Sequence, residues 1–167
     1  MSNPRVYVLT MVLLALTGCG ADRREADFDL QFIDNMMMHH RGAVEMARAA
    51  QPKLTHMETK ELARKIVSDQ TREINQLMAW RDEWYKGAPN AKSDKIPGMD
   101  MQHQMGGDPD VDFIEMMIPH HQGAIKMAKE ALPKAKHTEI RQLAQNIIAA
   151  QEVEINTMNE WKAAWRK

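Results

Sequence analysis

The chain has a single cysteine, Cys19, among 167 residues, and aromatic side chains make up only 5 % of the sequence. One cysteine cannot form a disulfide within the chain, and it disfavours structural zinc, because such sites usually combine Cys with His. Opposite charges nearly cancel, with 22 Lys and Arg against 23 Asp and Glu. The composition therefore offers no basic surface for nucleic acid, and we expect no nucleic-acid partner.

Long apolar runs are also lacking, since the stretch VYVLTMVLLAL near the N-terminus is too short to span a bilayer comfortably. With Arg5 before it, this stretch predicts an export signal over residues 1–18. The signal ends in LTGC, Leu16 to Cys19, which resembles the lipobox of bacterial lipoproteins, whose cysteine is lipidated. We expect Cys19 to anchor the protein to a membrane, with residues 19–26 as a polar tether. The protein would then face the periplasm or the exterior of a bacterial cell envelope. The alternative is a plain signal peptide with an incidental cysteine.

Methionine is abundant instead, with 15 residues, which invites a reason beyond the filling of a core. The chain is rich in Ala, Lys and Glu and has few β-branched runs, a composition that predicts an all-α protein. Its length suits one domain that buries a core without help from disulfides.

The sequence contains a duplication. Residues 27–85 match residues 108–166 at 25 of 59 positions when they are offset by 81 residues without a gap. In each copy, apolar or small residues spaced by three or four predict a first helix that ends near Pro52 or Pro133. A second helix should begin after His56 or His137.

Two helical hairpins, residues 27–85 and 108–167, with a joiner of residues 86–107, predict a four-helix bundle with pseudo-twofold symmetry. Residues 27–167 would form one domain, because neither hairpin could bury its apolar stripe alone. In the first copy, Thr55 and Glu58 match a capping box at the start of the second helix.

The histidines follow the duplication. Six of the seven form three repeat-related pairs, which are His39/His120, His40/His121 and His56/His137. Met36 stands three residues before His39 and four before His40, so both imidazoles can approach its thioether. His39 and His40 diverge by about 100° around a helix, so we expect one to face the bundle axis and the other an adjoining helix or the rim. His56 and His137 lie next to helix starts, which favours a capping or surface role.

Neutral imidazole together with thioether favours copper, as Cu(I), with Ag(I) as a mimic. The joiner supplies the same donors in GMDMQHQMGG, where Met99, Met101, His103 and Met105 alternate with polar residues. A flexible segment of this kind can wrap a soft cation. The alternative is an exposed loop with incidental methionines.

Two other interpretations need no metal. A methionine at helical spacing can simply fill a core. The buried histidines can be hydrogen-bonded in a polar network with Gln70, Glu73, Gln151 and Glu154. A di-iron carboxylate centre is disfavoured, because no Glu stands three residues before any of the central histidines.

FIDNMMMHHRGAVEMA and FIEMMIPHHQGAIKMA, each followed by Q-x-x-E-I-N and a Trp, closely resemble the bacterial family catalogued as domain of unknown function 305. The resemblance implies a ferritin-like four-helix bundle, export and, because some members are implicated in copper binding and tolerance, a copper site. Carried over residue by residue, it implicates Met36, His39, His40, Met46, Met117, His120, His121 and Met127. The first copy reads MMMHH where the family usually has M-I-P-H-H.

We therefore expect an exported, membrane-anchored protein that binds copper and sequesters it, buffers it or hands it to another copper-handling protein of the envelope. Nothing in the sequence resembles a nucleophile with a base, a phosphate loop or an open three-ligand catalytic site, so we expect no enzyme activity. Three alternatives stay open. One is a ferritin-like metal-dependent oxidase in which Glu73, Glu154 and the histidines hold a redox metal. The others are a bundle that binds haem between Met and His, without a C-x-x-C-H attachment, and a module whose Met-rich surface docks a partner protein.

Overall fold

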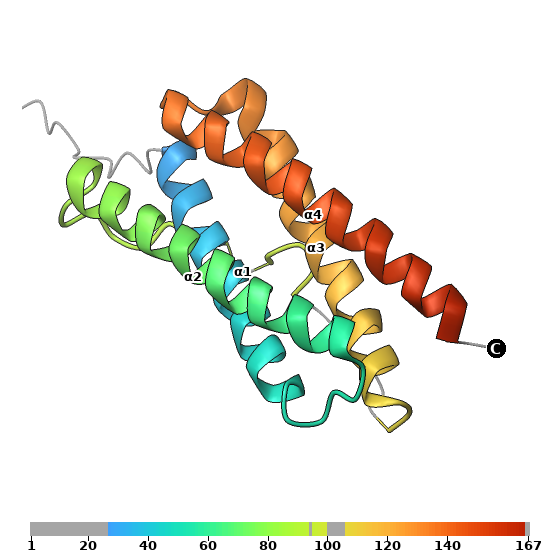
Figure 1. Ribbon diagram of the computed structural model, residues 1–167. Helices are drawn as coiled ribbons and strands as arrows, with labels where there is room; N and C mark the ends of the chain where they lie inside the picture. Colours follow the sequence, from blue (N-terminus) through green and yellow to red (C-terminus); the bar gives the residue numbers. More distant parts are fainter. Residues whose placement is uncertain (1–26, 94, 100–105, 166–167) are drawn as a thin grey trace, which may run out of the picture.

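The computed structural model describes residues 27–93, 95–99 and 106–165 of the chain. These residues form four α-helices and no strand: α1 (Phe28–Ala50), α2 (Met57–Trp84), α3 (Pro109–Lys134) and α4 (Thr138–Trp165). The helices make a four-helix bundle of two antiparallel hairpins, which confirms the predicted fold class (Figure 1). Within the described residues, no helix is long and apolar enough to cross a membrane. The predicted signal and tether, with Cys19, lie outside the described residues.

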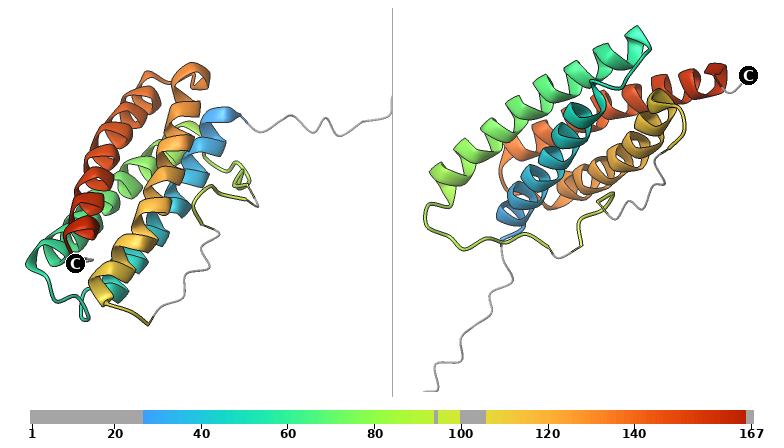
Figure 2. Two further views of the ribbon diagram at one scale, coloured as in Figure 1. Left: turned by 90° about the vertical axis from the view of Figure 1, so that its right-hand side faces the viewer. Right: turned by 90° about the horizontal axis from the view of Figure 1, so that it is seen from below.

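The two hairpins meet through their first helices. α2 packs against α1, α4 packs against α3, and α1 packs against α3. The described parts of the joiner run along α1 and α3, on the side away from α2 and α4 (Figure 2). The α1–α3 layer therefore has two different faces, one toward the joiner and one toward α2 and α4.

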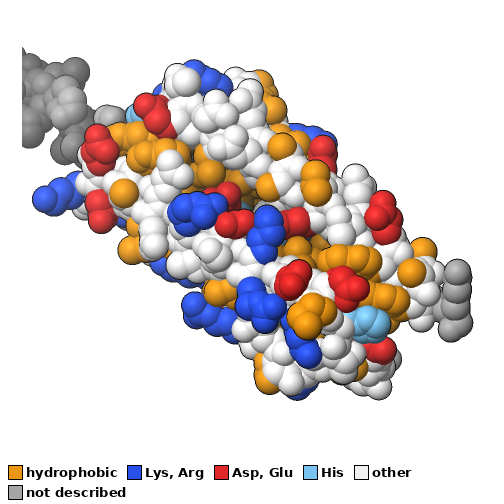
Figure 3. All heavy atoms as spheres, viewed as in Figure 1, with side chains coloured by type: hydrophobic (Ala, Val, Ile, Leu, Met, Phe, Trp, Pro, Cys, Tyr) orange, Lys and Arg blue, Asp and Glu red, His pale blue; other side chains and the backbone are white. Residues whose placement is uncertain are grey.

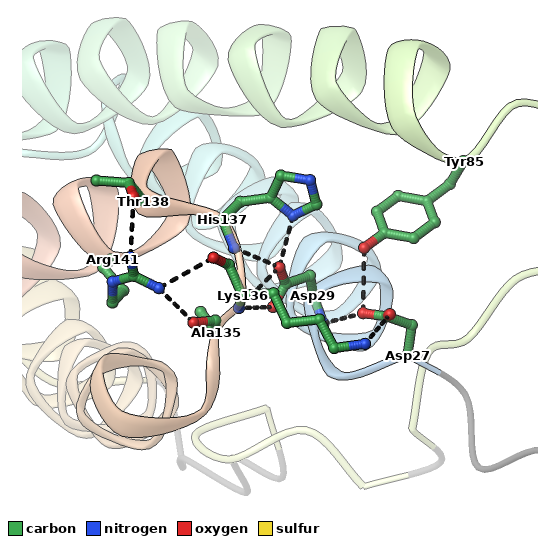
Figure 4. Close-up of polar contacts among 8 residues, drawn as sticks. All are labelled: Asp27, Asp29, Tyr85, Ala135, Lys136, His137, Thr138 and Arg141. Carbon is green, nitrogen blue, oxygen red and sulfur yellow. Dashed lines mark hydrogen bonds and ion pairs between the residues drawn. The ribbon is translucent and has the colours of Figure 1, made fainter.

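Acidic residues at the helix starts tie the hairpins together reciprocally. Asp27 and Asp108 cap their own helices, α1 and α3. The Asp29 carboxylate instead accepts hydrogen bonds from the backbone N–H groups of Lys136 and His137, just before α4 (Figure 4). Asp110, the repeat counterpart of Asp29, likewise accepts from the backbone N–H groups just before α2. Each hairpin thus caps the second helix of the other, as the predicted pseudo-twofold symmetry requires.

One predicted cap is wrong. The Thr55 hydroxyl donates to Asp110 Oδ2 at 2.6 Å, and the N-cap residue of α2, His56, makes no hydrogen bond through its side chain at that cap. The capping box of Thr55 with Glu58 is therefore absent from this helix start. A carboxylate from the other hairpin lies within reach of the same donors, and a charged acceptor forms the stronger hydrogen bond.

The helix ends also differ between the copies. α1 ends at Ala50, before Pro52, as the sequence predicts. α3 continues through Pro119 and one residue past Pro133. His56 and His137 lie at helix starts, and each stacks on a tryptophan of the other hairpin: His137 on Trp84 at 3.9 Å between ring centroids and His56 on Trp165 at 4.0 Å.

The apolar core is divided into two clusters by a layer of histidines. One cluster joins the first half of α1 to the second half of α3 and the first half of α4. The other joins the second half of α1 to the first halves of α2 and α3. Between them, at the middle of α1 and α3, lie four histidines that are at most 1 % exposed: His39, His40, His120 and His121. The bundle thus buries four imidazoles at its centre.

Candidate metal centre

His39 and His120 meet where α1 crosses α3. Their ring centroids lie 3.8 Å apart, with the ring planes inclined by 45°. No ring nitrogen of either residue makes a hydrogen bond of normal geometry among the described residues, although the backbones of Pro97 and His120 lie near enough to His39 to favour its protonated form. Buried polar groups without partners are costly, and protein interiors usually satisfy them. The pair therefore presents four buried nitrogens for which the described protein supplies no hydrogen bond of good geometry.

Both imidazoles are held in the neutral form. Burial, with a smaller contribution from the nearby His40, lowers the pKa of His39 from its ordinary 6.5 to about 3. Burial likewise lowers the pKa of His120 to about 2, with His39 as the next contributor. A neutral imidazole carries a free lone pair on one nitrogen, which is the form that binds metal ions.

The joiner places a thioether beside this pair. A Cβ built on Gly42 would lie 3.1 Å from Sδ of Met99 and 3.3 Å from Nε2 of His120, so both atoms border the same small space above α1. The missing side chain of Gly42 creates that space. Met99 remains 37 % exposed. The sulfur therefore reaches toward the buried imidazole and still has access to solvent.

Hydrogen bonds along α1 hold the joiner in this position. The Asp34 carboxylate accepts from the N–H of Ala91 at 2.8 Å, and the side-chain oxygen of Asn35 accepts from the N–H of Ser93 at 2.7 Å. Further along, Ile96 packs against the core. The joiner is thus attached to the bundle before it reaches Met99.

Two glycines let the joiner approach α3 closely. Gly98 has φ +78, and a Cβ there would lie 2.9 Å from the carbonyl oxygen of Pro119. A Cβ on Gly123 would overlap the carbonyl oxygen of Pro97. The backbone of the joiner therefore packs directly on the backbone of α3, and this contact fixes the position of Met99 relative to the histidines.

His40 and His121 point the other way, toward α2 and α4. Nε2 of His40 lies 2.7 Å from Glu73 Oε2, and Nε2 of His121 is hydrogen-bonded to Glu154 Oε2, also at 2.7 Å. Burial alone would raise the pKa of Glu154, but its contacts with His121 and Lys65 outweigh this effect and hold the pKa below its ordinary value. Adjacent histidines thus face different neighbours, as the predicted divergence of about 100° requires.

The other candidate ligands occupy several environments. Met36 and Met117 are fully buried, one helical turn before the histidines, and belong to the two core clusters. Met46 and Met127 lie six residues beyond His40 and His121, about 9 Å along the helix, and pack against those clusters. The structure does not place this second pair of methionines beside the histidines. Met101, His103 and Met105 lie outside the described residues.

Carboxylates, imidazoles and thiols alone do not complete a site. Among the described residues, no three His, Cys, Asp or Glu side chains are arranged to hold a metal ion. Ligands for a metal at the centre must therefore include other donors, such as the thioether of Met99 on the joiner side. On the opposite side the available donors are the amide oxygens of Gln70 and Gln151, which are buried and lack hydrogen-bond partners.

Comparisons with known proteins agree with this architecture. The family model described as Domain of unknown function (DUF305) matches residues 29–109 and 110–167. CopM, solved in Ag-bound, Cu(I)-bound and Cu(II)-bound forms, is 35 %, 34 % and 37 % identical, with a TM-score of 0.72 for each form. These matches cover 82–83 % of this chain and 98 % of CopM.

Two further relatives are more distant or shorter matches. A DUF305 protein from Streptomyces coelicolor is 26 % identical, with a TM-score of 0.74 over 83 % of this chain and 92 % of that one. Uncharacterized protein L153 of Acanthamoeba polyphaga mimivirus is 46 % identical over 50 residues, which are 30 % of this chain. That match spans only 33 % of the viral protein. Since the family model covers nearly all of the described helices, this chain belongs to the DUF305 family.

Proposed function

We propose that this protein binds copper as Cu(I) between α1, α3 and the joiner, and that it sequesters the ion or passes it on. The observation that carries the proposal is the pair of buried, neutral imidazoles of His39 and His120, whose nitrogens make no hydrogen bond of normal geometry among the described residues, with the Met99 thioether alongside. Imidazole nitrogen and thioether sulfur together favour Cu(I), and Ag(I) by the same chemistry. The likeness to CopM in its Ag-bound and Cu(I)-bound forms supports the same assignment.

The position of Met99 suits exchange of the metal. Its side chain is partly exposed and belongs to a segment outside the helices, whereas both histidines are buried in α1 and α3. A ligand that moves more readily than the other two gives an incoming acceptor a point of attack. We therefore assign buffering or transfer to another copper-handling protein, and no catalysed reaction.

The proposal includes a place in the cell. Residues 1–18 direct export, Cys19 carries a lipid, and residues 19–26 tether the bundle to a membrane of the bacterial envelope. Incorporation of labelled fatty acid into the full-length protein, and its loss in Cys19→Ala, tests this part separately from metal binding. A protein that is exported without any lipid would contradict the anchor and leave the copper site unaffected.

Anaerobic titration of Cu(I) against a chromophoric competitor tests the metal site. We expect wild type to withdraw Cu(I) from the competitor, Met99→Leu to bind at least about tenfold more weakly, and His39→Ala with His120→Ala to lose the site. Met57→Leu is the matched control, because Met57 is 64 % exposed. Equal competition by all four proteins would refute the proposed site.

A further inference from the structure

The face opposite the joiner has a polar cleft. α2 and α4 border a hollow of about 250 Å³ whose lining includes Gln70, Glu73, Gln151 and Glu154. Figure 3 shows acidic and basic side chains crossing this face between α2 and α4, with hydrophobic side chains on both sides. The cleft thus reaches the carboxylates that contact His40 and His121, and no thioether lines it.

Each hairpin contributes a glutamine and a glutamate to the lining of the cleft, and the glutamate contacts a histidine buried behind it. On α2, Gln70 and Glu73 are three residues apart and share a helix face, and Glu73 contacts His40 of α1. The repeat equivalents are Gln151, Glu154 and His121. We call these sets the first triad and the second triad.

The two glutamines have amide oxygens that the described protein leaves unpaired. Gln70 is 4 % exposed and Gln151 is 3 % exposed, and the Oε1 atom of each lacks a hydrogen-bond partner among the described residues. Both residues line the cleft. A buried carbonyl oxygen without a donor is costly, and a water molecule or a bound cation in the cleft would satisfy it.

The imidazole and carboxylate of the first triad supply two further donors. Nε2 of His40 and Oε2 of Glu73 are 2.7 Å apart, the distance of a hydrogen bond in which the imidazole N–H donates to the carboxylate. Loss of that proton frees both atoms to bind a metal ion. One imidazole nitrogen, one carboxylate oxygen and one amide oxygen, completed by water, form a donor set for a divalent transition metal. Thioether, the donor that selects Cu(I), is missing from the set.

A lysine makes the two triads unequal. Nζ of Lys65 lies 2.8 Å from Glu154 Oε1 and 2.9 Å from Asp69 Oδ2. The residue that corresponds to Lys65 in the second copy is Asn146, which is neutral and also lines the cleft. An ammonium group thus already compensates the carboxylate of the second triad, whereas the first triad has no equivalent lysine in the repeat.

We propose that the first triad, Gln70, Glu73 and His40, binds one divalent transition-metal ion, and that Lys65 prevents the second triad from binding another. Among divalent ions of the first transition row, Cu(II) should bind this site most tightly, by the general order of affinities. The site lies on the other face of the α1–α3 layer from the proposed Cu(I) site. The two proposals are independent, since they use different side chains and select ions of different hardness.

Co(II), which thioethers bind poorly, is the probe, and its visible absorption in the purified full chain gives the number of bound ions. We expect one Co(II) per wild-type chain, none in Glu73→Gln, and still one in the matched Glu154→Gln. Lys65→Asn copies the second-repeat residue and should raise the number to two. Asn146→Lys copies the first-repeat residue and should reduce it to none.

The design separates the possible failures. Far-UV circular dichroism will show whether Glu73→Gln folds. If it does not, Asn146→Lys still tests metal binding at the first triad, because Asn146 is exposed and a lysine there should not disturb folding. Met99→Leu should lose Cu(I) affinity and keep its Co(II), so a failure at one site leaves the other measurable. No Co(II) bound to wild type, or one ion retained by both Glu73→Gln and Asn146→Lys, would overturn the proposal. So would a single ion in Lys65→Asn.

Discussion

At the scale of single residues, the adjacent histidines give one imidazole to each face of the α1–α3 layer. His39 faces His120 and the joiner, whereas His40 faces Glu73 on α2. Consecutive side chains on a helix differ in direction by about 100°, so a His-His pair at the middle of a buried helix serves two separate environments. One environment offers sulfur and the other oxygen, which is why we assign them ions of different hardness.

The repeat-related glycines Gly42 and Gly123 should respond differently to the same change. In Gly42→Ala the new methyl group meets the Met99 thioether, the end of a flexible side chain, at 3.1–3.2 Å, and Nε2 of His120 at 3.3 Å. Met99 can move away, and Ala favours a helix over Gly by about 1 kcal/mol, so stability should be unchanged or slightly higher. Cu(I) affinity should fall by about tenfold, because the sulfur is displaced.

In Gly123→Ala the methyl group would overlap backbone, the Pro97 carbonyl, which cannot move without the joiner. We expect a loss of about 1–3 kcal/mol of unfolding free energy, as for other overpacked sites. Urea denaturation and Cu(I) competition of both variants measure the two effects. Two glycine variants with the same loss of stability would show that the joiner does not pack on α3 as described.

At the scale of helices, the starts of α2 and α4 are each capped by an aspartate of the other hairpin. Asp29 is fully buried at the start of α1, and its carboxylate accepts from two backbone N–H groups and approaches Nδ1 of His137 at 2.6 Å (Figure 4). Asp110 is equally buried and holds the start of α2. Since every such bond joins one repeat to the other, the two hairpins should unfold together.

Replacing either buried aspartate by asparagine keeps its shape but removes the charge. We expect Asp29→Asn and Asp110→Asn each to lose about 1–3 kcal/mol, because charged hydrogen bonds to helix N-termini become neutral and one amide donor faces another. Asp69→Asn is the control, since Asp69 pairs only at the surface of α2 and should change stability by less than about 1 kcal/mol. Urea denaturation followed by circular dichroism gives all three values. Equal effects in the control and the buried positions would contradict the reciprocal caps.

At the scale of the whole molecule, the duplication makes the fold and the central histidines predictable. The offset of 81 residues pairs His39 with His120, and helical spacing puts both in the middle of their helices. The path of the joiner is not predictable in this way, because it has no repeat counterpart, so the position of Met99 next to Gly42 and His120 needs the structure. The sequence pairs Thr55 with Glu58 because a local pattern contains only near neighbours, whereas Asp110 reaches Thr55 from 55 residues away. The contact of Lys65 with Glu154 is not predictable from the sequence, because it depends on the distance between α2 and α4.

Acid should destabilise the metal-free protein from just below neutral pH. His39 and His120 have folded pKa values of about 3 and about 2, below the ordinary 6.5, so the unfolded chain binds more protons between these limits. Stability therefore falls as the pH falls below 6.5, by up to about 1.4 kcal/mol per pH unit for each histidine. Unfolding free energies at pH 7 and pH 5 measure this dependence. His39→Leu with His120→Leu should remove most of it, and an unchanged slope in that variant would contradict the assignment.

Silver should stabilise the folded bundle by linking its parts. Ag(I) bound between α1, α3 and Met99 requires both hairpins and the joiner in their folded places, so it binds the folded chain in preference to the unfolded one. At a free concentration about 100 times the dissociation constant, this adds about 2.7 kcal/mol and raises Tm by several degrees. Thermal melts with and without Ag(I) measure the shift, and Met57→Leu should reproduce the wild-type value. Met99→Leu should shift less at the same Ag(I) concentration, and His39→Ala with His120→Ala should not shift. If His39→Ala with His120→Ala showed the same rise in Tm as wild type, silver would bind elsewhere, and the buried imidazoles would not be its ligands.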